Sequence, residues 1–215
     1  EYPMLSLSNT YSKEEIIEWE TRLKKGTENE LEYVCELKYD GVAIGIRYKN
    51  GQLFQAVTRG DGTEGEEVTT NVKTIRTIPL QLQGDFPEDF EIRGEIFFPL
   101  ENFNRLNAER EKNQEPLFAN PRNTASGTLK MQDSRVVAER GLDCYLYGVY
   151  GGDLPAEGHL EAVKKAKTWG FKTPPTEKRY IESTTSIDGM MDFINYWSDK
   201  RTELPFEIDG VVIKV

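Results

Sequence analysis

The chain has 215 residues, of which 37% are apolar and 30% charged, and its formal net charge is -10. This composition is typical of a folded globular protein and excludes a disordered chain. No apolar run approaches the roughly 20 residues that cross a bilayer, and the N-terminus lacks the features of a signal peptide. The acidic balance argues against a DNA-binding module that acts alone, because nonspecific affinity for DNA comes largely from basic side chains. We therefore expect one cytoplasmic domain, cut from a longer protein whose other parts would hold any DNA.

The first part of the chain has the pattern of one helix followed by strands. Ser12 and Glu15 form a capping box, and apolar residues then recur at helical spacing until Gly26. Between residues 31 and 58 the runs LEYVCELKY, VAIGIRY and QLFQAV are typical of strands, and Asn50-Gly51 is a hairpin signal between the last two. We expect these three strands to form one antiparallel meander.

The second part mixes strands and helices irregularly. FEIRGEIFF at 90–98 and LDCYLYGVY at 142–150 predict strands, and PFEIDGVVIKV predicts a strand at the end of the chain. Pro99 opens a helix that extends to about Asn113, with Phe103 and Leu106 on its inner face, and further helices are predicted over 158–169 and 187–201. Together with the hairpin, this order favours an α+β fold, with antiparallel sheets flanked by helices, over a doubly wound parallel sheet.

Cysteine and histidine usage argues against a metal centre. Cys35 and Cys144 lie in separate apolar strands, where buried free thiols are expected rather than a disulfide or a metal pair. The single histidine, His159, lies in a polar stretch, and we expect it to be exposed. A zinc site is therefore not predicted, and no metal-ligating residue is assigned.

The segment Glu36-Leu37-Lys38-Tyr39-Asp40-Gly41 carries the sharpest chemical signal. Alternate side chains of a strand share a face, so Glu36 and Lys38 project together, and Asp40-Gly41 then turns the chain. A lysine amine becomes a nucleophile only when it is deprotonated, which burial or neighbouring positive charge promotes. Taken alone, a solvated Lys-Glu pair on an edge strand explains the segment better.

Further charged residues are set into apolar strands. Arg93 and Glu95 share one face of the strand at 90–98, and Asp209 and Lys214 interrupt an otherwise apolar strand. Charged groups there must leave the apolar layer or find partners. Regularly placed charges on rigid strands predict a polar cleft.

Three further features each allow two interpretations, one functional and one purely structural. Arg59 lies in a glycine-rich loop that either brings it against a phosphate or ribose or merely joins two strands. The segment at 120–127 either leads into a helix whose first amides attract phosphate or is an ordinary loop capped by Asn123. The ring of Tyr147 either stacks on a base or fills the core, and its spacing favours the core.

The motifs together resemble one family. KYDG looks like the lysine-containing first motif of covalent nucleotidyltransferases, the DNA ligases and capping enzymes. CELKYDG, TRGDGTEGE, IRGEIF, FANPRNTASGTL, YGV and EIDGVVIKV occur in the order found in NAD-dependent DNA ligases, and PMLSLSN resembles their N-terminal linker. The resemblance covers nearly the whole chain, so that residues 1–215 would form the adenylation domain, a nucleotidyltransferase fold.

The resemblance implies a reaction and a set of site residues. A lysine attacks the α-phosphorus of NAD, releases nicotinamide mononucleotide (NMN), and passes AMP to the 5′-phosphate of a nick in double-stranded DNA, with Mg²⁺ as a helper. Lys38 is then the nucleophile, and the other implied residues have supporting roles. Ser6, Leu7 and Glu36 line the adenine end, Tyr147 covers the adenine, Glu95 holds the ribose, Arg59 and Lys214 contact the nucleotide, Asp40 supports the lysine, and Arg122 and Lys130 serve the phosphate and DNA side.

The chain also departs from the family pattern. Ser8 stands where an aspartate is common in the linker, and Lys130 stands where arginine is usual, which keeps the charge but loses bidentate phosphate binding. The family's N-terminal NMN-binding module and its later OB, zinc, helix-hairpin-helix and BRCT modules are absent from this chain. We therefore expect a monomer that by itself does not seal nicks and makes no contact with a membrane.

Two other functions remain open from the sequence. An ATP-dependent ligase or a capping-type nucleotidyltransferase would share Lys38 but use a triphosphate. A non-catalytic nucleotide-binding module would keep the fold without the chemistry, and the acidic balance is compatible with it.

Overall fold

The computed structural model describes residues 3–4, 6–62, 64–151, 154 and 156–215. Leu5 and Thr63, which belong to two of the family-like motifs, lie outside the described residues. The helices are α1 (Lys13–Lys24), α2 (Thr69–Val72), α3 (Leu100–Lys112), α4 (Pro121–Leu129), α5 (Ser134–Arg140), α6 (His159–Thr168) and α7 (Ile187–Lys200), with short 3₁₀ turns η1 (Thr176–Lys178) and η2 (Arg201–Glu203). The strands are β1 (Tyr33–Tyr39), β2 (Val42–Lys49), β3 (Gln52–Thr58), β4 (Asp89–Phe97), β5 (Asp143–Tyr150), β6 (Ile181–Thr184) and β7 (Ile208–Lys214).

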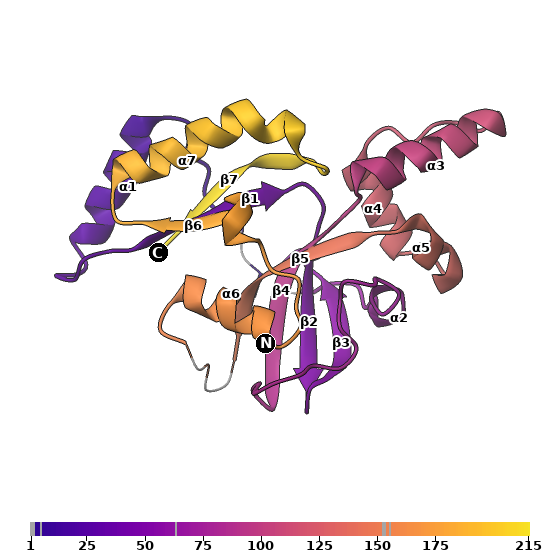
Figure 1. Ribbon diagram of the computed structural model, residues 1–215, viewed down its shortest axis with the longest axis horizontal. Coiled ribbons are helices and arrows are strands. Elements are labelled where there is room, and N and C mark those ends of the chain that lie inside the picture. The colour runs from indigo at the N-terminus through magenta and orange to yellow at the C-terminus, as the bar shows by residue number, and fades with distance from the viewer. Residues whose placement is uncertain (1–2, 5, 63, 152–153, 155) are drawn as a thin grey trace.

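The strands form two antiparallel sheets, in the orders β6-β1-β7 and β3-β2-β4-β5 (Figure 1). This arrangement confirms the predicted α+β class. The expected meander is wrong in one respect, because β1 does not pair with β2 and belongs to the smaller sheet. Only β2 and β3 form the predicted hairpin, with Asn50 and Gly51 at φ values of 48° and 76° in its turn, as a type I′ turn requires.

The chain changes sheets at Asp40-Gly41. A Cβ at Gly41 would lie 2.1 Å from the carbonyl oxygen of Ile96 in β4, so only glycine allows this close approach of two backbones. The segment was correctly predicted to turn, but the sequence pattern does not reveal that the following strand pairs elsewhere.

The smaller sheet buries one face of β1 under helices. Leu37 and Tyr39 pack in an aromatic cluster that includes Phe193 and Trp197 of α7, and α1 adds Ile16. The opposite face of β1 carries Glu36 and Lys38, as the alternation predicted. Because α1 and α7 occupy one face, the charged side chains are left on the other.

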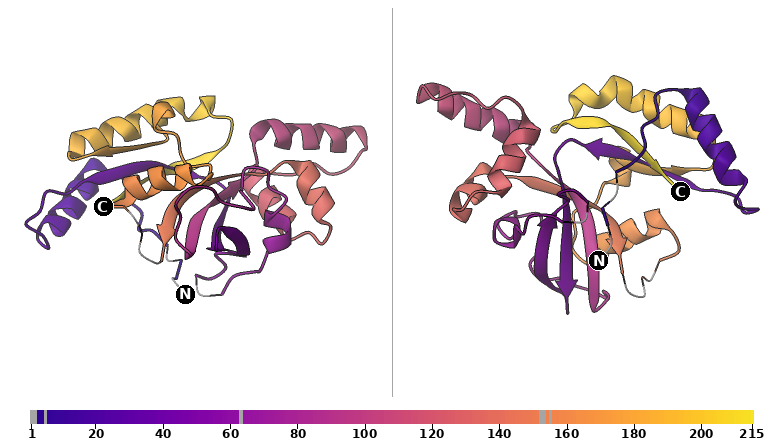
Figure 2. Two further views of the ribbon diagram at one scale, coloured as in Figure 1. Left: turned by 60° about the horizontal axis from the view of Figure 1, so that its bottom comes forward. Right: turned by 180° about the vertical axis from the view of Figure 1, so that it is seen from behind.

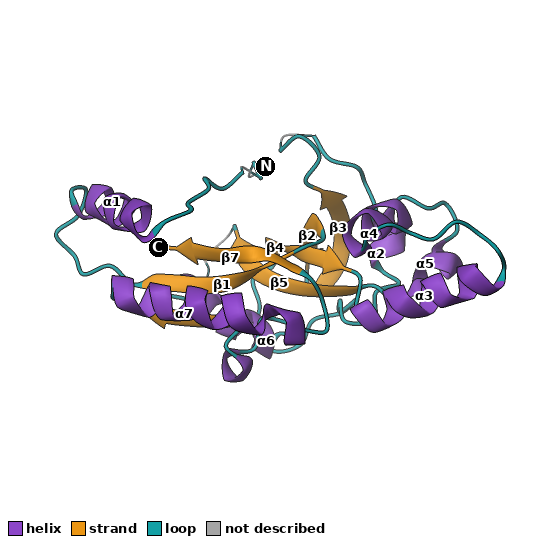
Figure 3. Cartoon of the chain, turned by 90° about the horizontal axis from the view of Figure 1, so that it is seen from above, coloured by secondary structure: helices purple, strands orange, loops and turns teal. Residues whose placement is uncertain are grey.

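The larger sheet has its own core beneath β2, β3, β4 and β5. Ile44, Ile46 and Ile92 are fully buried there. The helices α3, α4 and α5 group together at the end of the molecule away from α1 and α7 (Figures 1 and 2). Seen from above, strands occupy the middle of the molecule and helices lie outside them (Figure 3).

The two sheets meet through aromatic side chains and helix α6. The ring centroid of Tyr39 in β1 lies 4.9 Å from that of Tyr145 in β5. It lies 5.8 Å from the ring centroid of Phe97 in β4. Helix α6 contacts β5 of one sheet and β6 of the other. The polar faces of β1 and β4 are thereby held at a fixed separation.

Most local predictions hold. Ser12 accepts a hydrogen bond from the Glu15 amide at the start of α1, and Phe103 is buried in α3, where Pro99 is the capping residue rather than the first helical one. Cys35 and Cys144 are buried free thiols. Within the described residues, no helix is long and apolar enough to span a membrane.

Candidate functional site

A cleft of about 1120 Å³ lies where the polar faces of the two sheets meet. The structure brings together along it every residue predicted for the site: Ser6, Leu7, Glu36, Lys38, Asp40, Arg59, Glu95, Arg122, Lys130, Tyr147 and Lys214. These residues come from the N-terminal segment, the four strands β1, β4, β5 and β7, helix α4 with its C-cap, the turn after β1 and the loop after β3. The sequence prediction of a polar cleft on rigid strands is therefore confirmed in its geometry.

A β-bulge in β7 aims Asp209 at Lys38. Between the pairs Leu37↔Val211 and Tyr39↔Ile208, β7 has one residue more than β1, and Gly210 adopts a φ of 102°, a conformation that glycine tolerates best. Without the extra residue, Asp209 would point with Val211 into the helix-covered core. Instead its Oδ2 accepts a hydrogen bond from Lys38 Nζ at 2.6 Å.

A second bulge presents Tyr147. Gly94 pairs with Leu146 and Arg93 with Gly148, so Tyr147 is the extra residue of β5. Its ring lines the cleft and also packs against the aromatic cluster of the smaller sheet. The expectation that the ring packs in the core is therefore partly confirmed, and its stacking on a base stays a prediction.

The inner end of the cleft contains a buried carboxylate with two nitrogen partners. Glu36 is 4% exposed, and its Oε2 lies 2.5 Å from Lys214 Nζ. Its Oε1 lies 2.6 Å from Nε2 of His159. Burial alone raises the pKa of Glu36, but attraction to Lys214 and hydrogen bonding with His159 outweigh it, and the net pKa is lowered.

The expectation that His159 is exposed is wrong. Its side chain is 21% exposed and reaches Glu36 from the first residue of α6. The polar sequence around it gave no signal, because the contact joins residues 123 positions apart. Only the packing of α6 against the smaller sheet brings the two side chains together.

Glu95 lies next to this group, linked through Tyr147. The Tyr147 hydroxyl donates to Glu95 Oε2 at 3.2 Å, and Lys214 Nζ lies 4.7 Å above the tyrosine ring. Burial raises the pKa of Glu95 to about 7, although the hydrogen bond from Tyr147 acts in the opposite direction. Burial, and then the charge of Glu95, raises the pKa of the Tyr147 hydroxyl well above its usual value.

The outer end of the cleft carries ion pairs that face solvent. The side chains of Lys38 and Asp209 are 43% and 58% exposed, and the hydrogen bond from Lys38 is the main cause of the lowered pKa of Asp209. Lys130 Nζ lies 2.6 Å from Glu66 Oε2, with both side chains about half exposed. Pairs of this kind contribute only about 0–1 kcal/mol to stability.

Arg122 and Lys130 reach the cleft from α4. Asn120 caps this helix by accepting a hydrogen bond from the Asn123 amide, so the alternative of a loop capped by Asn123 is wrong and the segment is itself helical. Arg122, Ser126 and Lys130 follow one another at intervals of four residues and line the cleft, as residues on one helical face do. Arg122 Nη1 lies 3.4 Å from Asp40 Oδ1.

The remaining predicted residues, Arg59, Ser6 and Leu7, lie outside helices and strands, in segments held by backbone hydrogen bonds. The Arg59 amide donates to the carbonyl oxygen of Ala43, and a Cβ at Gly60 would lie 1.8 Å from the carbonyl oxygen of Glu64, so the loop needs its glycine. Ser6 and Leu7 line the cleft and are exposed. They follow Met4, whose amide donates to the carbonyl oxygen of Gly62.

The cleft has equal numbers of cationic and acidic residues among those described, although the formal net charge of the whole chain is -10. Six cationic residues line it among those described: Lys38, Arg59, Arg93, Arg122, Lys130 and Lys214. Six acidic residues do so too: Glu36, Asp40, Glu64, Glu66, Glu95 and Asp209. The cations of the cleft are thus interspersed with carboxylates, and Lys38, Lys130 and Lys214 each form an ion pair with one of them.

The described residues include no group of three or more His, Cys, Asp or Glu side chains that could hold a metal ion. The protein side chains therefore do not by themselves form a fitting Mg²⁺ site. An ion in the cleft would need oxygen ligands from phosphate and water, which commonly fill much of a Mg²⁺ shell.

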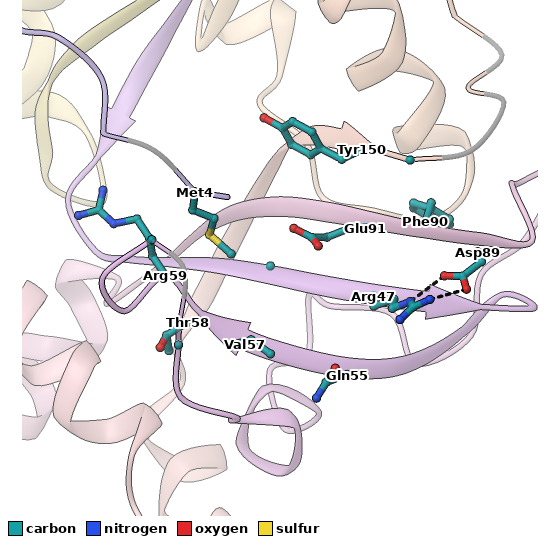
Figure 4. Close-up of a pocket in the computed structure, with 14 residues that line it drawn as sticks. Met4, Arg47, Gln55, Val57, Thr58, Arg59, Asp89, Phe90, Glu91 and Tyr150 are labelled. Carbon is teal, nitrogen blue, oxygen red and sulfur yellow. Dashed lines mark hydrogen bonds and ion pairs between the residues drawn. The ribbon is translucent and has the colours of Figure 1, made fainter. Parts of the chain in front are cut away.

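A second pocket of about 520 Å³ continues along the open face of the larger sheet. Met4 and Arg59 lie at one end and the ion pair of Arg47 with Asp89 at the other (Figure 4). Met4, Arg59 and Tyr150 line both pockets. The sequence patterns did not predict this extension.

Comparison with known proteins is consistent with this geometry. A family model described as the NAD-dependent DNA ligase adenylation domain matches residues 1–215. A DNA ligase of Christiangramia forsetii is 53% identical over 212 residues, which are 99% of this chain and 31% of that protein. A DNA ligase of Parabacteroides distasonis is 53% identical over 215 residues, and one of Flavobacterium psychrophilum 50% over 216, each covering 100% of this chain and 32% of the relative. The chain thus spans about a third of the length of the curated relatives it matches.

Proposed function

This chain belongs to the NAD-dependent DNA ligase adenylation domain family, and from that premise we propose that Lys38 is its nucleophile and becomes covalently adenylated. The observation that carries the proposal is the position of Lys38 on β1. Glu36 precedes it on the same face at the buried end of the cleft, and Asp40, paired with Arg122, follows it at the open end. A nucleotide that lies along this cleft would place its phosphate near the amine.

The proposed step is a substitution at phosphorus. The Lys38 amine, once free of its ion pair with Asp209 and deprotonated, forms a bond to the α-phosphorus of NAD. The bond from that phosphorus to the NMN phosphate oxygen breaks, and NMN leaves with the electron pair. The lysine loses its remaining extra proton, which gives a neutral phosphoramidate nitrogen bearing AMP.

The buried end would receive the adenosine half. We propose that Glu36, Ser6 and Leu7 line the adenine, that Tyr147 covers its face, and that Glu95 holds the ribose. A buried aromatic ring and a carboxylate with fixed partners suit the recognition of a flat polar base. Arg59 and Lys214 would stabilise the charge that develops on the phosphate.

The open end would serve the second substrate. In the full-length protein, AMP would pass from Lys38 to the 5′-phosphate of a nick in double-stranded DNA. Arg122 and Lys130 are exposed cations on one face of α4 and can exchange their carboxylate partners for DNA phosphates. Mg²⁺ is proposed only as an ion held by these phosphates and water.

The arrangement of the full-length protein is part of the same proposal. Residues 1–215 would be one adenylation domain of a cytoplasmic, monomeric enzyme, and the NMN-binding and DNA-encircling modules would lie in the other two thirds of the length that the relatives have. The isolated domain should then react weakly with NAD and seal no nicks.

Intact mass spectrometry tests the nucleophile. Full-length protein incubated with NAD should gain the mass of one adenylate, and Lys38→Ala should gain none. Lys164→Ala, at an exposed lysine of α6, is the matched control and should be adenylated normally. Equal adenylation of the Lys38→Ala variant would overturn the assignment, and adenylation by ATP but not by NAD would favour a triphosphate-dependent reaction.

A further inference from the structure

The Glu36 carboxylate is fixed by partners on both of its oxygens. Its Oε1 meets Nε2 of His159 at 2.6 Å and its Oε2 meets Nζ of Lys214 at 2.5 Å. The two partners come from different elements, α6 and β7, and the carboxylate between them is 4% exposed. A buried carboxylate held from two sides has little freedom to rotate.

The contacts define which atom carries each proton. An ionised carboxylate can only accept hydrogen bonds, so Nε2 of His159 must carry the hydrogen in this contact. Lys214 Nζ lies 3.3 Å from the same Nε2, and two donors cannot bond to each other. The Glu36 carboxylate therefore holds two donors side by side and stays available as an acceptor toward the cleft, which it lines.

The position of His159 is fixed by the packing of its helix. His159 is the first residue of α6, after Gly158 with a φ of 106°. Farther along α6, Val163 is buried against Val34 of β1 and Ile181 of β6. Since Val34 and Glu36 lie on the same face of β1, the helix that covers Val34 also brings the imidazole to Glu36.

We propose that His159 is a positioning residue that keeps Glu36 an oriented hydrogen-bond acceptor and thereby makes the cleft select a purine that carries an exocyclic amine. This inference rests on the proposed function, because it takes the dinucleotide NAD as the ligand of the cleft. The amine of adenine donates to a carboxylate, whereas hypoxanthine presents a carbonyl oxygen at the same place, and two acceptors that face each other cannot form a hydrogen bond. Unpaired polar groups at a buried site reject the wrong ligand strongly.

Loss of the imidazole loosens the acceptor. Oε1 of Glu36 would be left buried without its partner, and the carboxylate, held only by Lys214 at Oε2, would be free to turn. A carboxylate that turns no longer keeps a lone pair aimed at the exocyclic amine, so adenine loses its advantage over hypoxanthine. Selectivity between the two bases should therefore fall more than the rate with either base alone.

The test compares NAD, which donates adenylate, with nicotinamide hypoxanthine dinucleotide, which would donate inosinate, as substrates of the full-length protein. The ratio of kcat/KM for the two dinucleotides should favour NAD in the native protein and fall by about tenfold or more in His159→Ala. His159→Gln, whose amide can donate from the same place, should recover most of the ratio. Lys164→Ala on the exposed side of α6 should leave it unchanged.

A double-mutant cycle separates positioning from direct contact. Glu36→Gln should itself lower the ratio, because an amide can donate as well as accept, and in this background His159→Ala should have no further effect on it. An unchanged ratio in His159→Ala, or an equal fall in the Glu36→Gln background, would falsify the inference. Absence of any adenylation by NAD in the native protein would instead refute the proposed function.

Discussion

The two ends of the cleft hold similar charges in different surroundings. At the inner end, Glu36 with His159 and Lys214 is buried, whereas the pairs of Lys38 with Asp209 and Lys130 with Glu66 face solvent. Buried charges need every partner they have, because each lost partner leaves an uncompensated charge in a poor solvent. Solvated pairs exchange partners at little cost. The inner end is thus built to keep one geometry, whereas the proposed function has the outer end release its cations to incoming phosphates.

The largest expected effect contrasts the two ends directly. Lys214→Met leaves the Glu36 carboxylate without its closest cation and should lower the free energy of unfolding by about 3–5 kcal/mol. Lys130→Met, at the solvated pair with Glu66, should lower it by less than about 1 kcal/mol. Urea unfolding of the two variants measures both values, and equal losses would contradict the comparison.

The second prediction concerns Glu95 and pH. Its pKa is raised by burial to about 7 in the folded protein, from 4.5 in the unfolded chain. The stabilising effect of its protonated form is therefore complete below pH 4.5 and is lost as the pH rises to about 7. The free energy of unfolding should therefore fall by about 3 kcal/mol across this pH range.

Unfolding measured between pH 4.5 and 8 tests this prediction for the native protein and for Glu95→Gln. The variant cannot ionise at this position, so the difference in stability between the two proteins should change by the stated amount across the window. Parallel pH profiles would show that Glu95 is not held protonated by its surroundings.

A third prediction lies beneath the cleft, where the two sheets meet. The hydroxyl of Tyr39 is buried without a hydrogen-bond partner among the described residues. Tyr39→Phe should therefore raise the free energy of unfolding by roughly 1 kcal/mol. Tyr48→Phe is the matched control: that hydroxyl donates to the carbonyl oxygen of Pro79 at 2.6 Å, so the change should lower stability by a similar amount. A loss of stability in both variants would mean that Tyr39 has a partner.

The smallest effect tests partner exchange at the outer end. Glu66→Gln removes the carboxylate that lies against Lys130 and should tighten binding of nicked DNA to the full-length protein by roughly 2- to 5-fold at low salt. Titrations at two salt concentrations measure this, and the difference should shrink at high salt through screening. Unchanged affinity at low salt would mean that Lys130 does not exchange Glu66 for phosphate.

Much of the inner architecture was predictable because it depends on local periodicity. Alternation along β1 placed Glu36 and Lys38 on one face, and the same rule placed Arg93 and Glu95 together on β4. The helix caps and the Asn50-Gly51 turn follow from the conformations that these residues prefer. The family resemblance added the assignment of roles, which spacing alone did not support.

Other parts of the site were not predictable from alternation. Asp209 and Lys214 are an odd number of residues apart, so an unbroken strand would place them on opposite faces, and only the bulge at Gly210 brings both to the cleft. Tyr147 reaches the cleft through a second bulge. His159 reaches Glu36 because α6, which is distant from β1 in the sequence, packs against β1 in the fold.

By itself, the sequence determined the kinds of elements, the faces of β1 and β4, and the family to which the motifs point, because these depend on near neighbours in the chain. The tertiary structure alone decided that β1 leaves β2 for another sheet, that two bulges turn side chains toward the cleft, and that a histidine completes the partners of Glu36. Each of these depends on backbone pairing or burial between residues distant in sequence. Such contacts leave no period in the chain from which they can be predicted.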